Sequence, residues 1–376
     1  MINDKQSKRS MTINEIEELS KSSTVCIYGA GTVAKGMAER LVEILDININ
    51  FFCDRNPEKW GKDVISGIKC ISPDELRRIE DVICFVLVGQ HFINSVMDEL
   101  SNYTNIKYLI SYDDVINWDR IIDGILNKNI QIRKAGITRR FREADIYKVS
   151  NMHGKKIAVY TCITGGYDGI QQPLDVGDEC DYYCITDNMN DYGGQYTLIN
   201  ARDVIPSFID DNTKRNRYCK LLGNYLFSEY DYSVYVDGNV KIVGDIHEYI
   251  RNMNIYGFMS HAHAYEDCIY SEAIRVIVNK RDDEEIVISQ MQKYKNEGLP
   301  RHYGMLHNAI LVRKNNSSLC KSLMMDWWNE VWSYSKRDQL SLTYCMWKLG
   351  IPPEQCGTLG PNMRANTNFS WVSRHI

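Results

Sequence analysis

An acidic turn and a basic helix in the second half of the chain carry side chains suited to binding a diphosphate. The turn DGN (237–239) follows the apolar run YSVYV (232–236). Carboxylate and amide oxygens at a strand end can hold Mn²⁺ or Mg²⁺ against a diphosphate, although DGN is also a favourable β-turn sequence. Arg217 and Lys220 lie three residues apart, so they share one face of an expected helix. They would add positive charge beside a leaving phosphate, unless that face is simply exposed to solvent.

A further acidic residue, Asp338, stands at the start of a helical pattern in SKRDQLSLTYCMWKLG (335–350). The N-terminus of a helix favours the ionised form of a carboxylate at this position. An ionised carboxylate close to a reacting hydroxyl can act as a general base. The alternative is that Asp338 or Ser335 only caps the helix.

Three histidines lie near the ends of expected strands. His261 and His263 are in SHAHAYEDC (260–268), and His307 is in RHYGMLHN (301–308). The His-x-His spacing also occurs in metal sites. We favour contacts between these imidazoles and the hydroxyls of an acceptor or a sugar.

A glycine-rich turn in the first part of the chain has the pattern of a dinucleotide site. The sequence GAGTVA (29–34) lies between an apolar strand and a helical pattern, and Asp54 ends the next strand. Gly29 permits a tight turn, Gly31 allows backbone to approach a phosphate, and Asp54 could bind a ribose. The turn therefore predicts either a second nucleotide site, for example for NAD(P), or a purely architectural turn. We favour the architectural interpretation.

Alternating strands and helices must position these residues. The pattern predicts an α/β fold class, in which parallel sheets are covered by helices. In the first domain, strands are expected at 24–28, 47–53, 68–72, 81–89 and 106–110. In the second, strands are expected at 155–163, 180–186, 196–201, 232–238, 256–261 and 308–314, and helices at 212–227, 266–279, 283–296, 317–334 and 338–348.

These elements divide the chain into four parts. We expect a polar tail at 1–22, a Rossmann-like domain at 23–116, a helical connector at 117–152 and a second α/β domain at 153–376.

The composition is that of an ordinary globular protein. The 376 residues contain 44 Lys and Arg against 49 Asp and Glu, for a net charge of −5. Hydrophobic residues make up 44% and charged residues 25% of the chain, which excludes a disordered chain or a coiled-coil rod. The mild acidity argues against a nucleic-acid partner. We find no apolar signal segment or spanning run, so we expect a cytoplasmic protein.

Most of the second domain resembles the glycosyltransferase-like family of the plant pollen and seed-mucilage type, which has bacterial members. The segments that carry the resemblance follow one another in order: KIAVYTCITGGYD (156–168), QQPLD (171–175), CDYYCITDN (180–188), NRYCKLLGNYLF (216–227), YSVYVDGNVKIVGD (232–245), HAHAYEDCIYSEA (261–273), QMQKYKNEGLP (290–300), YGMLHNAILVRKNN (303–316) and WWNEVWSYSKRDQLSLTY (327–344). Residues 23–116 resemble a small Rossmann-like module that is fused to enzymes of bacterial surface polysaccharides.

The resemblance implies a GT-A fold that binds a nucleotide-sugar. It implies that Asp237 and Asn239 bind metal and diphosphate, that His375 completes the metal site, that Gly304 lies near the donor sugar, and that Asp338 is the base of an inverting enzyme. Asn replaces the second acidic residue of the family's metal turn, which weakens metal binding. Since ligands bind beyond the carboxyl ends of strands, we also place certain residues at the nucleotide: Thr161, Thr164, Gly165, Tyr167 and Asp187.

The expected activity is transfer of a sugar from a nucleoside diphosphate to a glycan or lipid-linked acceptor. By resemblance, the setting is assembly of a bacterial surface polysaccharide such as capsule or O-antigen. The protein would use Mn²⁺ or Mg²⁺ and could associate peripherally with membrane-bound polysaccharide machinery at the inner face of the cytoplasmic membrane. Two alternatives remain: an NAD-dependent sugar-modifying oxidoreductase, and a scaffold that binds a nucleotide-sugar without turnover.

Overall fold

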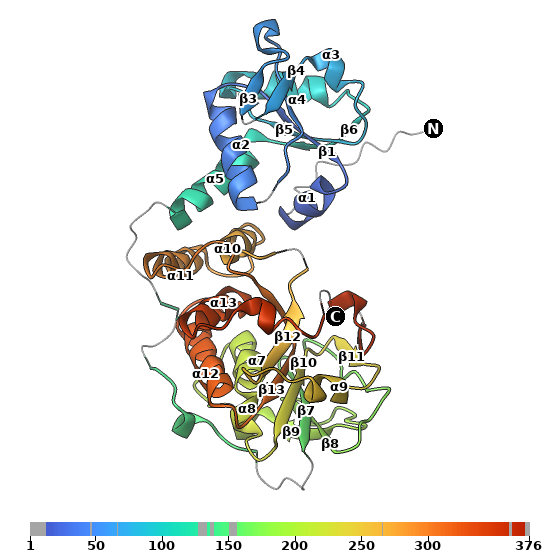
Figure 1. Cartoon of the computed structure of the whole chain (residues 1–376), viewed down its shortest axis with the longest axis vertical. Helices are drawn as coiled ribbons and strands as arrows, with labels where there is room; N and C mark the ends of the chain where they lie inside the picture. Colours follow the sequence, from blue (N-terminus) through green and yellow to red (C-terminus); the bar gives the residue numbers. More distant parts are fainter. Residues whose placement is uncertain are drawn as a thin grey trace. The chain divides into compact units, whose positions relative to one another are not determined.

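The computed structural model describes residues 13–45, 47–65, 67–126, 134–135, 139–149, 156–264, 266–360 and 363–372. The chain forms two compact units (Figure 1). One consists of Met1–Asn129 with Ala273–Arg281, and the other of Ile130–Glu272 with Asp282–Ile376. No described helix is long and apolar enough to cross a bilayer.

The first unit is built around a six-stranded sheet with the order β3-β4-β2-β1-β5-β6. All its pairs are parallel except β3 with β4, which are antiparallel. Its strands are β1 (Thr24–Tyr28), β2 (Phe51–Cys53), β3 (Asp63–Ile65), β4 (Ile68–Ile71), β5 (Val82–Val86) and β6 (Ile106–Ile110). Its helices are α1 (Ile13–Ser20), α2 (Thr32–Leu45), α3 (Pro73–Leu76), α4 (Ile93–Leu100) and α5 (Tyr112–Leu126).

Two boundaries differ from those expected. Helix α1 lies within the expected polar tail, and its Ile16 is buried. Helix α5 runs across residue 116, where we expected the first domain to end, and the compact unit extends to residue 129. Within α5, Val115, Trp118, Ile121, Ile122 and Ile125 are all buried, so an apolar face attaches this helix to its unit.

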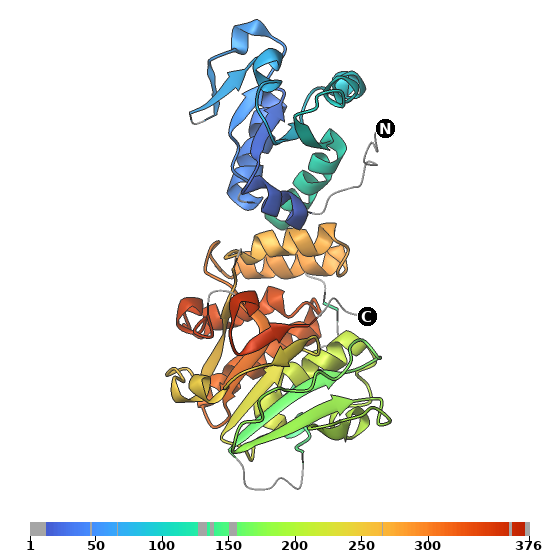
Figure 2. The ribbon, with the colours of Figure 1, turned by 90° about the vertical axis from the view of Figure 1, so that its right-hand side faces the viewer.

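The second unit contains a mixed six-stranded sheet with the order β12-β13-β10-β7-β8-β9 (Figure 2). Strands β10, β7, β8 and β9 are parallel neighbours, whereas β13 is antiparallel to both β10 and β12. The six strands are β7 (Ile157–Ile163), β8 (Cys180–Thr186), β9 (Thr197–Asn200), β10 (Tyr232–Val236), β12 (Phe258–Ala262) and β13 (Leu306–Lys314). A separate antiparallel pair joins β11 (Val240–Ile242) to β14 (Phe369–Trp371).

The helices of this unit are α6 (Ala201–Val204), α7 (Asn212–Leu221), α8 (Gly223–Leu226), α9 (His247–Arg251), α11 (Glu284–Asn296), α12 (Ser318–Ser333) and α13 (Gln339–Lys348). Helix α10 (Ile269–Val278) begins in this unit, and its residues from Ala273 onward belong to the first unit. The predicted α/β class is confirmed by both sheets. The helix expected over 212–227 is two helices, because the chain leaves helical geometry at Leu222.

An aromatic layer connects α7, α12 and part of the expected connector. Phe141 is buried, and its ring packs edge-on against Trp328 and Trp332 of α12. Tyr218 of α7 also packs edge-on against Trp328. Aromatic pairs of this kind add stability beyond the area they bury. The layer therefore fixes α7 relative to α12, the helix that precedes α13.

Candidate active site

Helix α7 and strand β10 bring the predicted basic and acidic residues together. Asp211 caps α7, since its side chain accepts a hydrogen bond from the backbone N–H of Lys214. Strand β10 ends at Val236, and the N–H of Asp237 still donates to the carbonyl of Ala309 on β13. The N–H of Val240 then donates to the carbonyl of Asp237, which closes the DGN turn.

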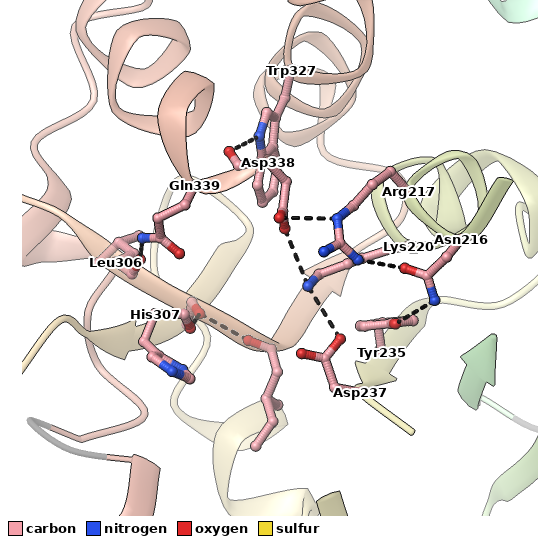
Figure 3. A network of polar contacts seen from close by, with 12 residues as sticks. Asn216, Arg217, Lys220, Tyr235, Asp237, Leu306, His307, Trp327, Asp338 and Gln339 are labelled. Carbon is pink, nitrogen blue, oxygen red and sulfur yellow. Dashed lines mark hydrogen bonds and ion pairs between the residues drawn. The ribbon is translucent and has the colours of Figure 1, made fainter. Parts of the chain in front are cut away.

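Lys220 forms ion pairs with two carboxylates (Figure 3). Its Nζ lies 3.2 Å from Asp237 Oδ1 and 3.1 Å from Asp338 Oδ2. Arg217 Nε lies 2.9 Å from Asp338 Oδ1. The Lys220 side chain is 2% exposed and that of Asp338 6%, whereas that of Asp237 is 28% exposed. The structure thus brings four predicted residues into one cluster, which opens to solvent at Asp237.

Asp338 acts within this cluster as the partner of two cations. Burial alone would raise the pKa of its carboxyl, but Arg217 and Lys220 outweigh burial and hold that pKa well below its usual range. The side chain makes no capping hydrogen bond to α13, so the capping alternative is wrong for this residue. The backbone is held separately, because Trp327 Nε1 donates to the carbonyl of Asp338 at 2.9 Å. A carboxylate with a lowered pKa is a weak base, so the geometry favours a positioning role.

The loop after β7 is held in place by several of the residues expected to line the nucleotide pocket. Thr161 and Thr164 are 5% and 4% exposed, and Thr164 Oγ1 donates to the carbonyl of Asn212. Gly165 has a φ of +70°, and a Cβ there would lie 2.4 Å from the Asn212 amide.

Asp187 and Tyr167 lie beside the same loop. The Gly165 N–H donates to Asp187 Oδ2 at 2.9 Å, and Asp187 also pairs with Arg215 at 3.2 Å. These residues therefore shape the loop, while the ring of Tyr167 stays 58% exposed.

The expected metal donors do not form a metal site by themselves. Asp237 supplies a carboxylate, and Asn239, which is 3% exposed, can supply only a neutral amide oxygen. The parts of the chain that the structure describes contain no group of three or more His, Cys, Asp or Glu that could hold a metal. His375 lies outside the described residues. The donors described at this turn therefore do not fit a divalent ion without further ligands.

Gly304 precedes β13 and is joined to α13. Its φ is +100°, and its carbonyl accepts a hydrogen bond from Thr343 Oγ1 at 3.0 Å. Near it, Gln339 Nε2 donates to the carbonyl of Leu306. The glycine loop is thus tied to the helix that begins beside Asp338.

The three histidines do not share one role. His261 is 0% exposed, and Asn366 Nδ2 lies 2.9 Å from its Nε2. Burial and the neighbouring His307 lower the pKa of His261 to about 4. The expected contact of His261 with an acceptor is therefore not supported, because no surface of this ring is available. His263 and His307 are only partly buried, and their ring centroids are 6.0 Å apart.

A buried network that we did not predict holds the last turn of α7. Arg313 of β13 is 0% exposed, and its Nη1 donates to the carbonyl of Lys220 at 2.8 Å. Its Nη2 donates to Tyr160 Oη at 3.0 Å. Tyr160 Oη in turn donates toward the carbonyls of Cys219 and Lys220. The one signal in the sequence was a charged residue inside the apolar strand NAILVRK (308–314).

The glycine-rich turn of the first unit packs against backbone atoms and side chains of the same unit. Gly29 has a φ of +113°, and a Cβ there would lie 2.4 Å from the carbonyl oxygen of Leu87. Asp54 Oδ2 accepts from the N–H of Ala30 and pairs with Lys59 Nζ at 2.7 Å. The acidic residue expected at a ribose therefore already has partners inside the unit.

The sequence matches a family model over residues 182–369, which is half of the chain. The model describes the TOD1/MUCI70 glycosyltransferase-like domain. Comparison with curated proteins finds no significant match.

Three solved structures show partial similarity at low identity. The WbbM bifunctional glycosyltransferase in its apo form is 12% identical with a TM-score of 0.33, and the match covers 54% of this chain and 39% of WbbM. Mouse xyloside xylosyltransferase 1, also in its apo form, is 9% identical with a TM-score of 0.23, covering 87% of this chain and 81% of that one. RSP, a Rex-family repressor, is 15% identical with a TM-score of 0.21, covering 29% and 63%.

The family match includes the turn at 237–239, the end of α7 and the start of α13, and so contains the whole charged cluster. The chain therefore belongs to the TOD1/MUCI70 family and carries its glycosyltransferase-like domain.

Proposed function

We propose that the second unit is an active glycosyltransferase that takes a sugar from a nucleoside diphosphate donor. The observation that carries this proposal is the buried cluster of Arg217, Lys220, Asp237 and Asp338. An ammonium has three N–H donors, so two ion pairs leave one for a ligand oxygen. Fixed positive charge in a site of low water content stabilises negative charge that develops on a leaving diphosphate.

In this proposal each residue has a defined task. Lys220 and Arg217 stabilise the leaving diphosphate, and Asp338 holds both cations in position. Asp237, the most exposed member of the cluster, contacts the donor. Tyr167, on the loop after β7, is 58% exposed, and we assign it to the nucleotide. Asp338 as a general base remains a prediction, which its lowered pKa does not favour.

We further propose that the acceptor is a glycan or lipid-linked sugar of a bacterial surface polysaccharide. Support for this setting comes from the resemblance of residues 23–116 to modules fused to such enzymes. A cytoplasmic location is part of the same proposal.

A thermal-shift screen of nucleoside diphosphates and their sugar conjugates tests the donor class. A ligand at 100 times its Kd should add about 2.7 kcal/mol to the free energy of unfolding. Lys220→Met should lose most of the affinity for the best ligand. Lys214→Met is the matched control, because Lys214 lies on the same helix but its Nζ donates to the carbonyl of Trp332. Equal binding by both variants, or no shift with any nucleotide, would contradict the proposal.

A further inference from the structure

Trp371 is an exposed aromatic residue that lies beside the DGN turn. Trp371 ends strand β14, and it pairs in register with Val240, the residue that follows Asn239. The N–H of Val372 donates to the carbonyl of Asn239 at 3.0 Å. The Trp371 side chain is therefore held next to the turn that bears Asp237, and it is 39% exposed.

Exposure of a single large ring is common and by itself says little. Trp371 is notable for its neighbours, which are the DGN turn and the ring of His307. The centroid of its ring lies 6.4 Å from that of His307, with an interplanar angle of 62°. His307 in turn faces His263 at 6.0 Å. An indole face and two imidazoles thus line one area at the margin of the cluster.

His307 lies in a segment that is hydrogen-bonded to the residue after Asp338. It follows Leu306, whose carbonyl accepts a hydrogen bond from Gln339, the residue after Asp338. In Figure 3, His307 and Arg217 lie on opposite sides of the cluster, with Asp237 and Asp338 between them. Arg217 is therefore on one side of the two carboxylates, and His307 is on the other.

We infer that Trp371, His307 and His263 form the subsite for a neutral pyranose ring of the acceptor. This inference rests on the proposed function, which assigns the cationic side to the donor diphosphate. A pyranose presents an apolar C–H face that can cover an indole and a rim of hydroxyls that imidazole nitrogens can hydrogen-bond. An uncharged ring needs no cation to bind it, and the cations Arg217 and Lys220 are ion-paired with Asp237 and Asp338 in the cluster.

Fluorine NMR of the full chain labelled with 5-fluorotryptophan tests the subsite directly. The signal of Trp371 is identified by its loss in Trp371→Phe. Trp60, which is 40% exposed in the first unit, supplies the control signal. The probes are methyl glycosides of glucose, galactose, mannose, rhamnose and N-acetylglucosamine, added with and without the nucleoside diphosphate that binds best.

We expect at least one glycoside to shift the Trp371 signal and to leave the Trp60 signal in place. Trp371→Ala should weaken binding of that glycoside roughly tenfold while leaving the Kd of the nucleoside diphosphate unchanged, and Trp371→Phe should retain most of the affinity. The inference is overturned if no glycoside shifts the signal, or if the nucleotide alone accounts for the shift. A glycoside shift without any nucleotide binding would support the subsite and refute the proposed donor, so the two proposals fail separately.

Discussion

The ion pairs of Arg217 and Lys220 determine what Asp338 can contribute to catalysis. Asp338→Asn would remove the carboxylate that pairs with Arg217 and one of the two that pair with Lys220. Loss of one partner in a buried pair costs about 3–5 kcal/mol. From the sequence alone we would expect almost no change in stability, because Asn is itself a good cap. We now expect a clear decrease in melting temperature together with a loss of transfer activity.

The pH profile distinguishes a positioning residue from a base. If Asp338 only positions the cations, Asp338→Asn lowers the rate by the same factor at every pH between 5 and 9. If Asp338 is the base, the rate of Asp338→Asn instead rises with pH across this range, because hydroxide must replace the missing carboxylate, whereas the wild-type rate does not. Asp282→Asn is a suitable control, since Asp282 accepts from Ser335 and Lys336 just before α13 but is not part of the cluster.

His261 should make the stability of the protein depend on pH. Its pKa is about 4 in the folded protein, because it is buried, and about 6.5 in an unfolded chain. The unfolded chain therefore binds the proton first as the pH falls, so the free energy of unfolding decreases between about pH 6.5 and pH 4. The full loss is about 3 kcal/mol. Urea unfolding across this pH range should show the loss, and His261→Gln should remove it, whereas substitution of the exposed His91 should not.

Asn239 allows a direct test of metal dependence. The expected need for Mn²⁺ or Mg²⁺ stays a prediction, and the wild-type turn offers a single carboxylate. Asn239→Asp adds a second carboxylate of the same size, which increases the negative charge available to a divalent ion. We expect Mn²⁺ to strengthen nucleoside diphosphate binding about tenfold more in Asn239→Asp than in the wild type. Calorimetry with Mn²⁺ and with EDTA measures both ratios, and equal ratios would exclude Asn239 from the metal site.

At the scale of elements, side chains from strands β7 and β13 fix the position of the last turn of α7. Arg313 and Tyr160 hold the carbonyl of Lys220, so they set where the Lys220 side chain begins. The same packing requires Gly223, because a Cβ there would lie 1.9 Å from Tyr160 Oη. Arg313 is thus a positioning residue that acts through Lys220.

Arg313→Met should raise the Kd for the nucleoside diphosphate about tenfold, since a misplaced ammonium loses its ligand contact. Ser233→Ala is the control for stability, because Ser233 is also fully buried but donates to Asn315, whose amide donates to the carbonyls of Phe227 and Tyr230 outside α7. Calorimetry should separate the two variants even if both melt earlier than the wild type. Similar nucleotide affinities would show that Arg313 is only structural.

The periodic elements could be predicted from sequence, but the short ones could not. Strands β1, β6 and β8 begin and end where their apolar runs predict. Strands β3, β11 and β14 have three residues each, too few for a periodic pattern, and all three were missed. The four residues of the candidate cluster could each be predicted from sequence. Their ion pairs could not, because α7, β10 and α13 meet only in the folded chain. His261 was misjudged because burial of a polar residue cannot be read from its neighbours in sequence.

At the scale of the whole molecule, the two units give separable predictions for nucleotide binding. A Cβ at Gly31 would meet no described atom within 4 Å, so Gly31→Val should fold normally and still obstruct a phosphate at this turn. Because Asp54 is already engaged, we expect one nucleotide site in the wild type and an unchanged site in Gly31→Val. A second calorimetric site that disappears in Gly31→Val would establish the first unit as a nucleotide-binding domain.

The pairing of β11 with β14 has a consequence for how the protein is made. Val240 leaves the ribosome long before Trp371, its partner across the ribbon. Until residues 369–371 are synthesised, the segment after the DGN turn lacks that partner strand, and closing so long a loop has an entropic cost. Such long-range pairings form slowly in general. A nascent chain can therefore complete α7, β10 and α13 and still lack part of its acceptor side, so that full activity would arise only after residues 369–371 have left the ribosome and paired with β11.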